Sequence, residues 1–170
     1  MSMAQIKNPT TATEVRLYNL PGLTVLPELP AATVVRLYNL SGLTVLPELP
    51  AATEVWLYNL PGLTVLPELP AATEVGLYNL PGVTVLPELP AATEVGLYNL
   101  PGISAGKDSR GYWFVPAKIK GEWRIIAGCR NLSIDAARKH WGPGGVSDRP
   151  DCLKLVERCV AMIGMGIRHD

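Results

Sequence analysis

The chain has 170 residues, of which 48% are hydrophobic, and it contains 16 Pro and 16 Gly. The proline content excludes a helical bundle, and the hydrophobic content excludes a disordered chain. The formal net charge is zero, yet residues 13–103 carry eight Glu against two Arg (−6), whereas residues 104–170 carry twelve Lys or Arg against seven acidic residues (+5). We therefore expect an acidic region followed by a basic one.

Residues 1–12 have no apolar core of the length that a secretory signal needs, and we expect them to be a lead segment that partly caps the acidic region. No stretch of the sequence is long and apolar enough to span a membrane. The three cysteines, Cys129, Cys152 and Cys159, form no CxxC pair, and one of them is left over in any disulfide scheme. The sequence therefore predicts a soluble cytoplasmic protein with reduced thiols and no membrane partner.

A nearly identical run of 20 residues recurs from Thr13, Thr33, Thr53 and Thr73, and a fifth copy that starts at Thr93 breaks off after Ile103. A period of this length is typical of stacked supersecondary units, each of which needs its neighbours to bury its apolar face. Residues 13–103 are therefore predicted to form a repeat solenoid.

Each period contains one step of two residues between apolar positions, as at Val35 and Leu37, and its other steps are of three. The step of two predicts a short strand, whereas steps of three with Pro47 and Pro50 favour an extended, polyproline II return and exclude an α-helix. The strands are expected in one parallel sheet, at residues 15–17, 35–37, 55–57, 75–77 and 95–97.

The run VRLYNLSGL from Val35 resembles the core of leucine-rich repeats, and LPELP from Leu46 resembles the short repeats of bacterial effector proteins. This resemblance implies an α/β fold with a concave sheet that recognises proteins. Leu40 departs from the family, which usually has Asn or Cys there to tie successive coils together, so Asn39 is expected to bond the turn instead. A triangular β-solenoid with a second strand at LTVL, from Leu43, is the alternative.

One column varies among the repeats: positions 16, 36, 56, 76 and 96 are Arg, Arg, Trp, Gly and Gly, at the outward centre of each predicted strand. Arg and Trp are enriched at the energetic centres of interfaces. The predicted binding residues are Arg16, Arg36 and Trp56, with Tyr18, Tyr38 and Tyr58 beside them. The glycines would leave the far end flat. Two alternatives stay open: drift at an outward position, and a Tyr column that only packs along the surface.

After residues 104–111, expected to be a linker, residues 112–119 and 122–127 predict a β-hairpin. Ser133 is a suitable N-cap for a helix IDAARKHW, and Asp148 for a second helix from Pro150. The inward stripe of the second helix is expected to hold Cys152, Leu155, Val156, Cys159, Val160 and Ile163. Residues 112–170 are thus predicted to be an α+β unit of ββαα order.

The simplest role for this basic unit is to cap the open end of an acidic solenoid. Its segment GEWRIIAGCR, followed by a helix that ends in HW, resembles small domains attached to repeats in bacterial or phage-encoded proteins, a resemblance that implies no activity. The amino end has fewer residues to cover it, so a homodimer through that end is a further hypothesis.

Catalysis has weak support, because Cys129 and His140, with Asp135 or Asp148 as orienter, are the only candidate thiol and imidazole pair. No spacing suits zinc, and no cofactor is expected. The candidate nucleic-acid residues are Arg124, Arg130, Arg138, Lys139, Trp123 and Trp141, for which a solvated basic face is the commoner explanation. We expect a non-catalytic module that binds a protein partner. The alternative is that the repeat is a handle for a working C-terminal domain, either a nucleic-acid binder or a cysteine-dependent enzyme.

Overall fold

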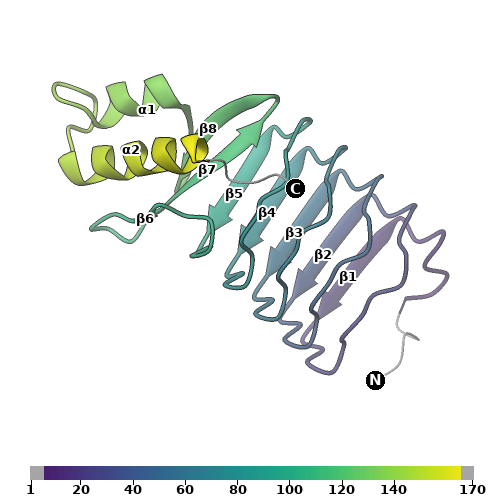
Figure 1. The fold of residues 1–170 in the computed structure, drawn as a ribbon. Coiled ribbons are helices and arrows are strands. Elements are labelled where there is room, and N and C mark those ends of the chain that lie inside the picture. The colour runs from purple at the N-terminus through teal and green to yellow at the C-terminus, as the bar shows by residue number, and fades with distance from the viewer. Residues whose placement is uncertain (1–5, 166–170) are drawn as a thin grey trace.

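The computed structural model describes residues 6–165 and shows a solenoid of about four turns followed by a smaller unit (Figure 1). The solenoid strands are β1 (Glu14–Tyr18), β2 (Val34–Tyr38), β3 (Glu54–Tyr58), β4 (Glu74–Tyr78) and β5 (Glu94–Tyr98). They lie side by side in chain order and are all parallel, with each residue paired to the one 20 positions later. The prediction of a parallel-strand solenoid with a period of 20 is confirmed.

Each strand has five residues rather than the expected three, and its second and fourth residues point into the core. In β2, for example, Val35 and Leu37 are buried whereas Arg36 between them is only half-buried. The returns between the described strands contain neither helix nor strand. The alternative with a second strand at LTVL is therefore wrong.

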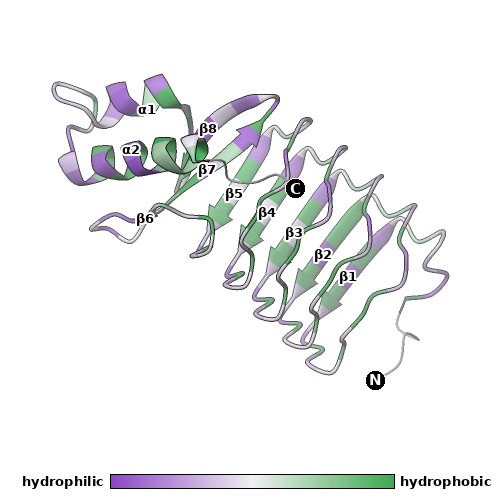
Figure 2. Cartoon of the chain, viewed as in Figure 1, coloured by the Kyte–Doolittle hydropathy of each residue, from purple (hydrophilic) through white to green (hydrophobic). Residues whose placement is uncertain are grey.

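The core of the solenoid is a stack of nearly identical layers of apolar side chains. In the second coil the fully or nearly fully buried positions are Ala32, Val35, Leu37, Leu40, Leu43, Leu46 and Leu49. Burial of these seven side chains, at roughly 1.5 to 3 kcal/mol for each large one, does not offset the ordering of 20 residues at roughly 1 to 2 kcal/mol each. Contacts between coils must supply the rest. In Figure 2 much of the solenoid, in its strands and its returns, has the green colour of hydrophobic residues.

Two side-chain ladders also join the coils. Asn39 Nδ2 donates to Asn19 Oδ1 at 2.7 Å, and the same bond recurs from Asn59, Asn79 and Asn99, each to the Asn one coil before. The Thr33 hydroxyl donates to the Thr13 carbonyl at 3.0 Å, with equivalents in the later coils. The expectation that these asparagines would bond the turn instead of neighbouring coils is wrong. Their backbone is left-handed (Asn39 φ 57°), and this lets an Asn one position early reach along the solenoid.

The C-terminal unit contains a four-stranded antiparallel sheet and two helices. Its elements are β6 (Gly106–Lys107), β7 (Trp113–Ile119), β8 (Glu122–Ala127), β9 (Arg130–Ser133), α1 (Ile134–Trp141) and α2 (Pro150–Gly164). The hairpin and both helices match the predicted positions. The strands β6 and β9 were not expected, and β6 lies in the segment 104–111 that was predicted to be a linker.

The helix caps agree with the sequence at one helix and not at the other. The Ser133 side chain accepts a hydrogen bond from the Ala136 N–H at 3.2 Å, as a helix N-cap does. The N-cap of α2 is Arg149, without a side-chain cap, and Asp148 accepts instead from the Gly144 N–H at 3.2 Å. The predicted Asp148 cap is therefore wrong.

Side chains alternate between the two faces of the C-terminal sheet, and each face packs against a different buried cluster. Phe114 and Ile125 belong to the cluster that packs against the helices, which also contains Trp141, Cys152 and Cys159. Hydrophobic and hydrophilic bands alternate along α2, as expected of a helix with one covered face (Figure 2).

The other face of this sheet is part of the solenoid core. Its buried residues there are Val115, Ala117, Ile119 and Ile126. Backbone hydrogen bonds join the end of β7 to the last full return, from the Leu89 N–H to the Lys118 carbonyl (2.9 Å) and from the Lys120 N–H to the Leu89 carbonyl (3.1 Å). An ion pair between Lys118 and Glu88 (2.6 Å) lies beside them.

At the other end of the solenoid only Ile6 and Ala12 are seen to pack against the core from the lead segment, and Leu20 and Leu23 of the first coil stay half-buried. The rest of the expected partial cap, residues 1–5, lies outside the described residues. None of the helices in residues 6–165 has the length and apolar character needed to cross a bilayer.

Candidate functional site

The outward side of the strands β1–β5 carries three parallel columns of side chains, which we call the open face. The first column is Glu14, Val34, Glu54, Glu74 and Glu94, the second is Arg16, Arg36, Trp56, Gly76 and Gly96, and the third is Tyr18, Tyr38, Tyr58, Tyr78 and Tyr98. The predicted binding residues therefore do lie together on one surface.

The two arginines of the open face are held by neighbouring carboxylates. Arg16 forms an ion pair with Glu14 in its own strand, and Arg36 forms one with Glu54 of the next strand. The hydrogen bond to Glu54 raises the pKa of Arg36, although desolvation of the guanidinium opposes this effect. The acidic column is thus neutralised at the N-terminal half of the face. Among the described residues, Glu74 and Glu94 have no basic partner.

The tyrosines form a stack along the solenoid. The ring centroids of Tyr18 and Tyr38 are 4.9 Å apart and those of Tyr38 and Tyr58 are 6.0 Å apart, with the rings nearly parallel. Such ring pairs contribute about 0.5 to 1.5 kcal/mol beyond the area they bury. The column therefore packs along the surface, and it still exposes nearly half of Tyr18, Tyr58 and Tyr98.

The glycines of the middle column make room for large rings. A Cβ on Gly76 would lie 2.3 Å from the Trp56 ring, and a Cβ on Gly96 would lie 2.3 Å from the Tyr78 hydroxyl. Trp56 thus lies over Gly76 and stacks on Tyr78, with centroids 6.0 Å apart and ring planes 2° from parallel. The expected flat surface at this end is wrong, because the glycines are covered by aromatic side chains.

Two pockets flank Trp56. The first, of about 220 Å³, is lined by Tyr38, Trp56, Leu57, Tyr58 and Tyr78, and we call it the aromatic pocket. The second, of about 380 Å³, lies over Gly96 and extends to the turn between β8 and β9; its lining includes Trp56, Tyr78, Glu94, Gly128 and Cys129. We call it the Gly96 pocket. The aromatic pocket thus lies over β2, β3 and β4, and the Gly96 pocket lies over β3, β4 and β5.

The candidate catalytic thiol and imidazole, Cys129 and His140, both lie in the C-terminal unit. Within residues 6–165, no hydrogen bond joins Cys129 to His140. Burial, followed by the charge of Arg130, lowers the pKa of His140. Burial raises the pKa of Cys152 to about 11 and that of Cys159 to about 12, which keeps both thiols protonated at neutral pH. These two cysteines are packing residues, whereas Cys129 is exposed.

The candidate nucleic-acid residues are also partly engaged elsewhere. Arg124 donates to the Asn131 side chain (2.5 Å) and carbonyl (3.0 Å), and Arg138 holds Glu157 through two hydrogen bonds of 2.8 and 2.9 Å. Trp141 is 2% exposed, so its ring cannot stack on a base. Arg130 and Lys139 remain exposed.

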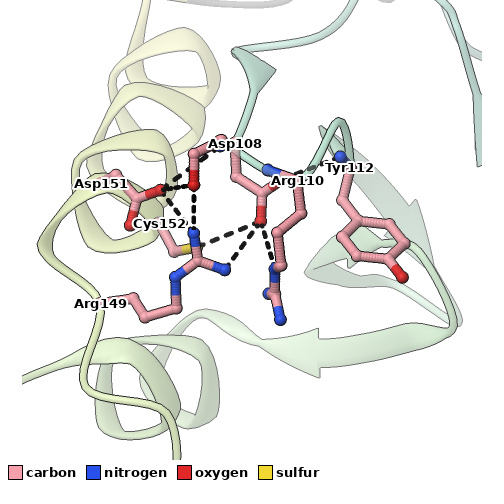
Figure 3. A network of polar contacts seen from close by, with 7 residues as sticks. Asp108, Arg110, Tyr112, Arg149, Asp151 and Cys152 are labelled. Atoms are coloured by element: carbon pink, nitrogen blue, oxygen red, sulfur yellow. Dashed lines mark hydrogen bonds and ion pairs between the residues drawn. The ribbon is translucent and has the colours of Figure 1, made fainter.

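A buried polar network in the C-terminal unit was not predicted (Figure 3). The Asp108 side chain has no exposed surface and accepts hydrogen bonds from the Tyr112 N–H (2.9 Å), the Arg110 N–H (3.0 Å) and Arg149 (3.3 Å). Burial alone would raise the pKa of Asp108, but the hydrogen bonds from Tyr112 and Arg110 outweigh it and lower the pKa. Arg149 also binds Asp151 at 2.7 Å. This network joins residues 106–112 to the start of α2.

The part of the chain that the structure describes contains no group of three or more His, Cys, Asp or Glu placed to hold a metal ion. No protein-family model, no curated protein and no solved structure matches the chain. The architecture itself is that of a repeat protein with a parallel-strand solenoid.

Proposed function

We propose that this chain is a protein-interaction module of leucine-rich-repeat-like build, whose open face binds a protein partner. The observation that carries the proposal is the position of Trp56, a large ring that is only half-buried and borders two pockets on an otherwise regular sheet. Half-buried Trp, Tyr and Arg side chains on a rigid surface are the residues that contribute most to binding energy at interfaces.

Rigidity strengthens this proposal. The strands that carry Arg36 and Trp56 are held by the buried leucine layers below and by the Asn and Thr ladders at their ends. A surface that is ordered before binding loses less conformational entropy when a partner docks. The open face therefore needs no rearrangement to present its side chains.

The C-terminal unit is proposed to act as the end cap of the solenoid. Without it, the apolar layer beneath β5 and the free backbone edge of β5 would be open to association with other chains. Val115, Ala117, Ile119 and Ile126 cover that layer, and the bonds at Leu89 hold the unit on the last return. An end cap needs no reactive thiol, and Cys152 and Cys159 of this unit are both buried.

The experiment is a pull-down with the full chain and a double variant, Arg36→Gly and Trp56→Gly. Glycine already occupies this column at 76 and 96, so the strands tolerate it. A matched control replaces the exposed Val45 and Val65, in the returns of the same two coils, by Gly. We expect the affinity of the open-face variant for the captured partner to fall by about tenfold or more, and the affinity of the control to stay unchanged. Equal retention by both variants would contradict the proposal.

A further inference from the structure

The two pockets beside Trp56 differ in charge although they share two walls. Trp56 and Tyr78 line both. The other residues that line the aromatic pocket are Tyr38, Leu57 and Tyr58, whereas the lining of the Gly96 pocket includes the acidic residue Glu94. These adjacent pockets are therefore suited to one apolar and one charged side chain of a bound segment.

The Gly96 pocket is an environment for a cation. Glu94 is exposed and, among the described residues, has no ion pair, whereas Glu14 and Glu54 in the same column each hold an arginine. The faces of Trp56 and Tyr78 carry the negative part of an aromatic quadrupole, which attracts an ammonium or a guanidinium group. No Lys or Arg lines this pocket. A basic group from outside would therefore complete it.

The repeat sequence shows how this recess arises. In the second coil the Arg36 side chain neutralises Glu54, but Gly96 has no side chain that could pair with Glu94 in the same way. Tyr78 leans into the space, with its hydroxyl over Gly96. The ring stack extends from Tyr18 to Tyr78, and Tyr98 makes no ring contact within the described residues. The Gly96 pocket thus opens where the arginine is missing and the tyrosine stack ends.

We propose that the Gly96 pocket binds a basic side chain of the partner, with arginine preferred to lysine, while the aromatic pocket takes an apolar side chain of the same segment. This inference rests on the proposed function and specifies its partner. Arginine fits better because its planar guanidinium stacks on a ring and donates to a carboxylate at the same time. In an extended segment, side chains two positions apart lie on one side at about 7 Å, so one apolar and one basic residue can reach both pockets.

The test uses the full chain and an acetylated, amidated pentapeptide, Ala-Leu-Ala-Arg-Ala, with a second peptide that has Gln in place of Arg. Binding is followed by the amide resonance of Gly96 and the indole resonance of Trp56, assigned by the loss of its signal in Trp56→Phe. We expect saturable shifts at both positions with the arginine peptide. The glutamine peptide lacks the cation that would contact the rings of Trp56 and Tyr78 and the Glu94 carboxylate. It is therefore expected to bind about fivefold more weakly.

The protein is varied in the same way. Glu94→Gln leaves the two rings in place and removes only the carboxylate, so it is expected to weaken the arginine peptide by about threefold, the effect of an exposed ion pair, and to leave the glutamine peptide unchanged. Glu48→Gln, which removes the same charge from an exposed position in a return, is the matched control and is expected to change neither.

Equal binding of the two peptides, absence of shifts at Gly96, or an equal effect of Glu94→Gln and Glu48→Gln would each overturn the inference. The proposed function is distinguishable from it. If the partner in the pull-down is lost with the Arg36→Gly and Trp56→Gly variant but is insensitive to Glu94→Gln, the open face binds a partner without a basic residue in the Gly96 pocket.

Discussion

In the solenoid each inner coil meets a nearly identical coil on both sides, whereas in the C-terminal unit each element meets a different one. Side-chain hydrogen bonds of the solenoid join residues 20 positions apart, as in the Asn and Thr ladders. Those of the C-terminal unit join residues such as Arg149 and Asp108, which are 41 positions apart, or Arg138 and Glu157, which are 19 apart. The ladders of the first region repeat the same two contacts, whereas the second region uses each contact once.

This difference has consequences for stability. When one contact is repeated, its loss at the end of the solenoid affects one neighbour and its loss in the middle affects two. When each contact is unique, as at Asp108, there is no second copy that retains part of the effect. We therefore expect substitutions in the solenoid to be graded by position, and substitutions in the C-terminal network to depend on the individual residue.

The largest expected effect is that of a buried leucine in the middle of the solenoid. Leu60 is 0% exposed and lies between two coils, so Leu60→Ala is expected to lower the free energy of unfolding by about 2 to 5 kcal/mol. Leu20, the same position in the first coil, is half-buried. Leu20→Ala is therefore expected to cost less. Urea unfolding of both variants measures the two losses, and equal losses would contradict grading by position.

The next effect concerns Asp108 of the C-terminal unit. Asp108→Asn removes the charge from a side chain with no exposed surface and weakens its bonds to Arg110 and Arg149. We expect a loss of about 1.5 to 3 kcal/mol at pH 7, the range of hydrogen bonds to charged groups. The control is Asp135→Asn, whose side chain is 98% exposed, and it is expected to change the unfolding free energy little.

Acidification tests the same residue through its charge. Because the pKa of Asp108 is lowered in the folded state, its ionisation stabilises the fold above the unfolded pKa, about 3.9, and this contribution disappears as the pH falls through the lower folded pKa. The difference in unfolding free energy between the natural chain and Asp108→Asn is thus expected to shrink as the pH falls below about 4. A difference that stays constant with pH would show that the charge of Asp108 does not contribute.

The sequence predicted the solenoid because its signal is repeated. One spacing of two, as between Val35 and Leu37, is weak evidence for a strand, but it recurs in every coil and each copy must fold in the same way. The helices of the C-terminal unit could also be placed, since the Ser133 cap and the apolar stripe of α2 are local signals. Local or repeated patterns were sufficient for these elements.

The elements and contacts that were missed depend on distant partners. The strands β6 and β9 are two and four residues long and have no clear alternation of apolar residues, so only their pairing with β7 and β8 defines them. Asp108 lies in a stretch that has the composition of a turn, and nothing local indicates Arg149 as its partner. Trp56 can lie over Gly76 only because residue 76, in the next coil, has no side chain, so this contact depends on two residues that are 20 positions apart.

The Asn ladder was missed because it depends on the backbone conformation of the asparagines, and substitution of these residues tests how much the ladder stabilises the solenoid. Asn19, Asn39 and Asn59 all have left-handed backbone, with φ between 55° and 57°, and this conformation carries the side chain into line with the next coil. Asn59 makes two ladder bonds, to Asn39 (2.9 Å) and from Asn79 (2.6 Å), whereas Asn19 makes only the one from Asn39.

The smallest expected effect is therefore a difference between two alanine variants. Asn59→Ala and Asn19→Ala carry the same backbone cost, about 1 kcal/mol for alanine in a left-handed conformation, but they remove two bonds and one bond respectively. Asn59→Ala is expected to lower the unfolding free energy by about 0.5 to 1.5 kcal/mol more than Asn19→Ala does, the net value of one hydrogen bond. Asn59→Gly, which removes the bonds without the backbone cost, separates the two contributions in the same urea experiment. If Asn59→Gly were as stable as the natural chain, the ladder bonds would add nothing to the solenoid and the asparagines would serve only their backbone conformation.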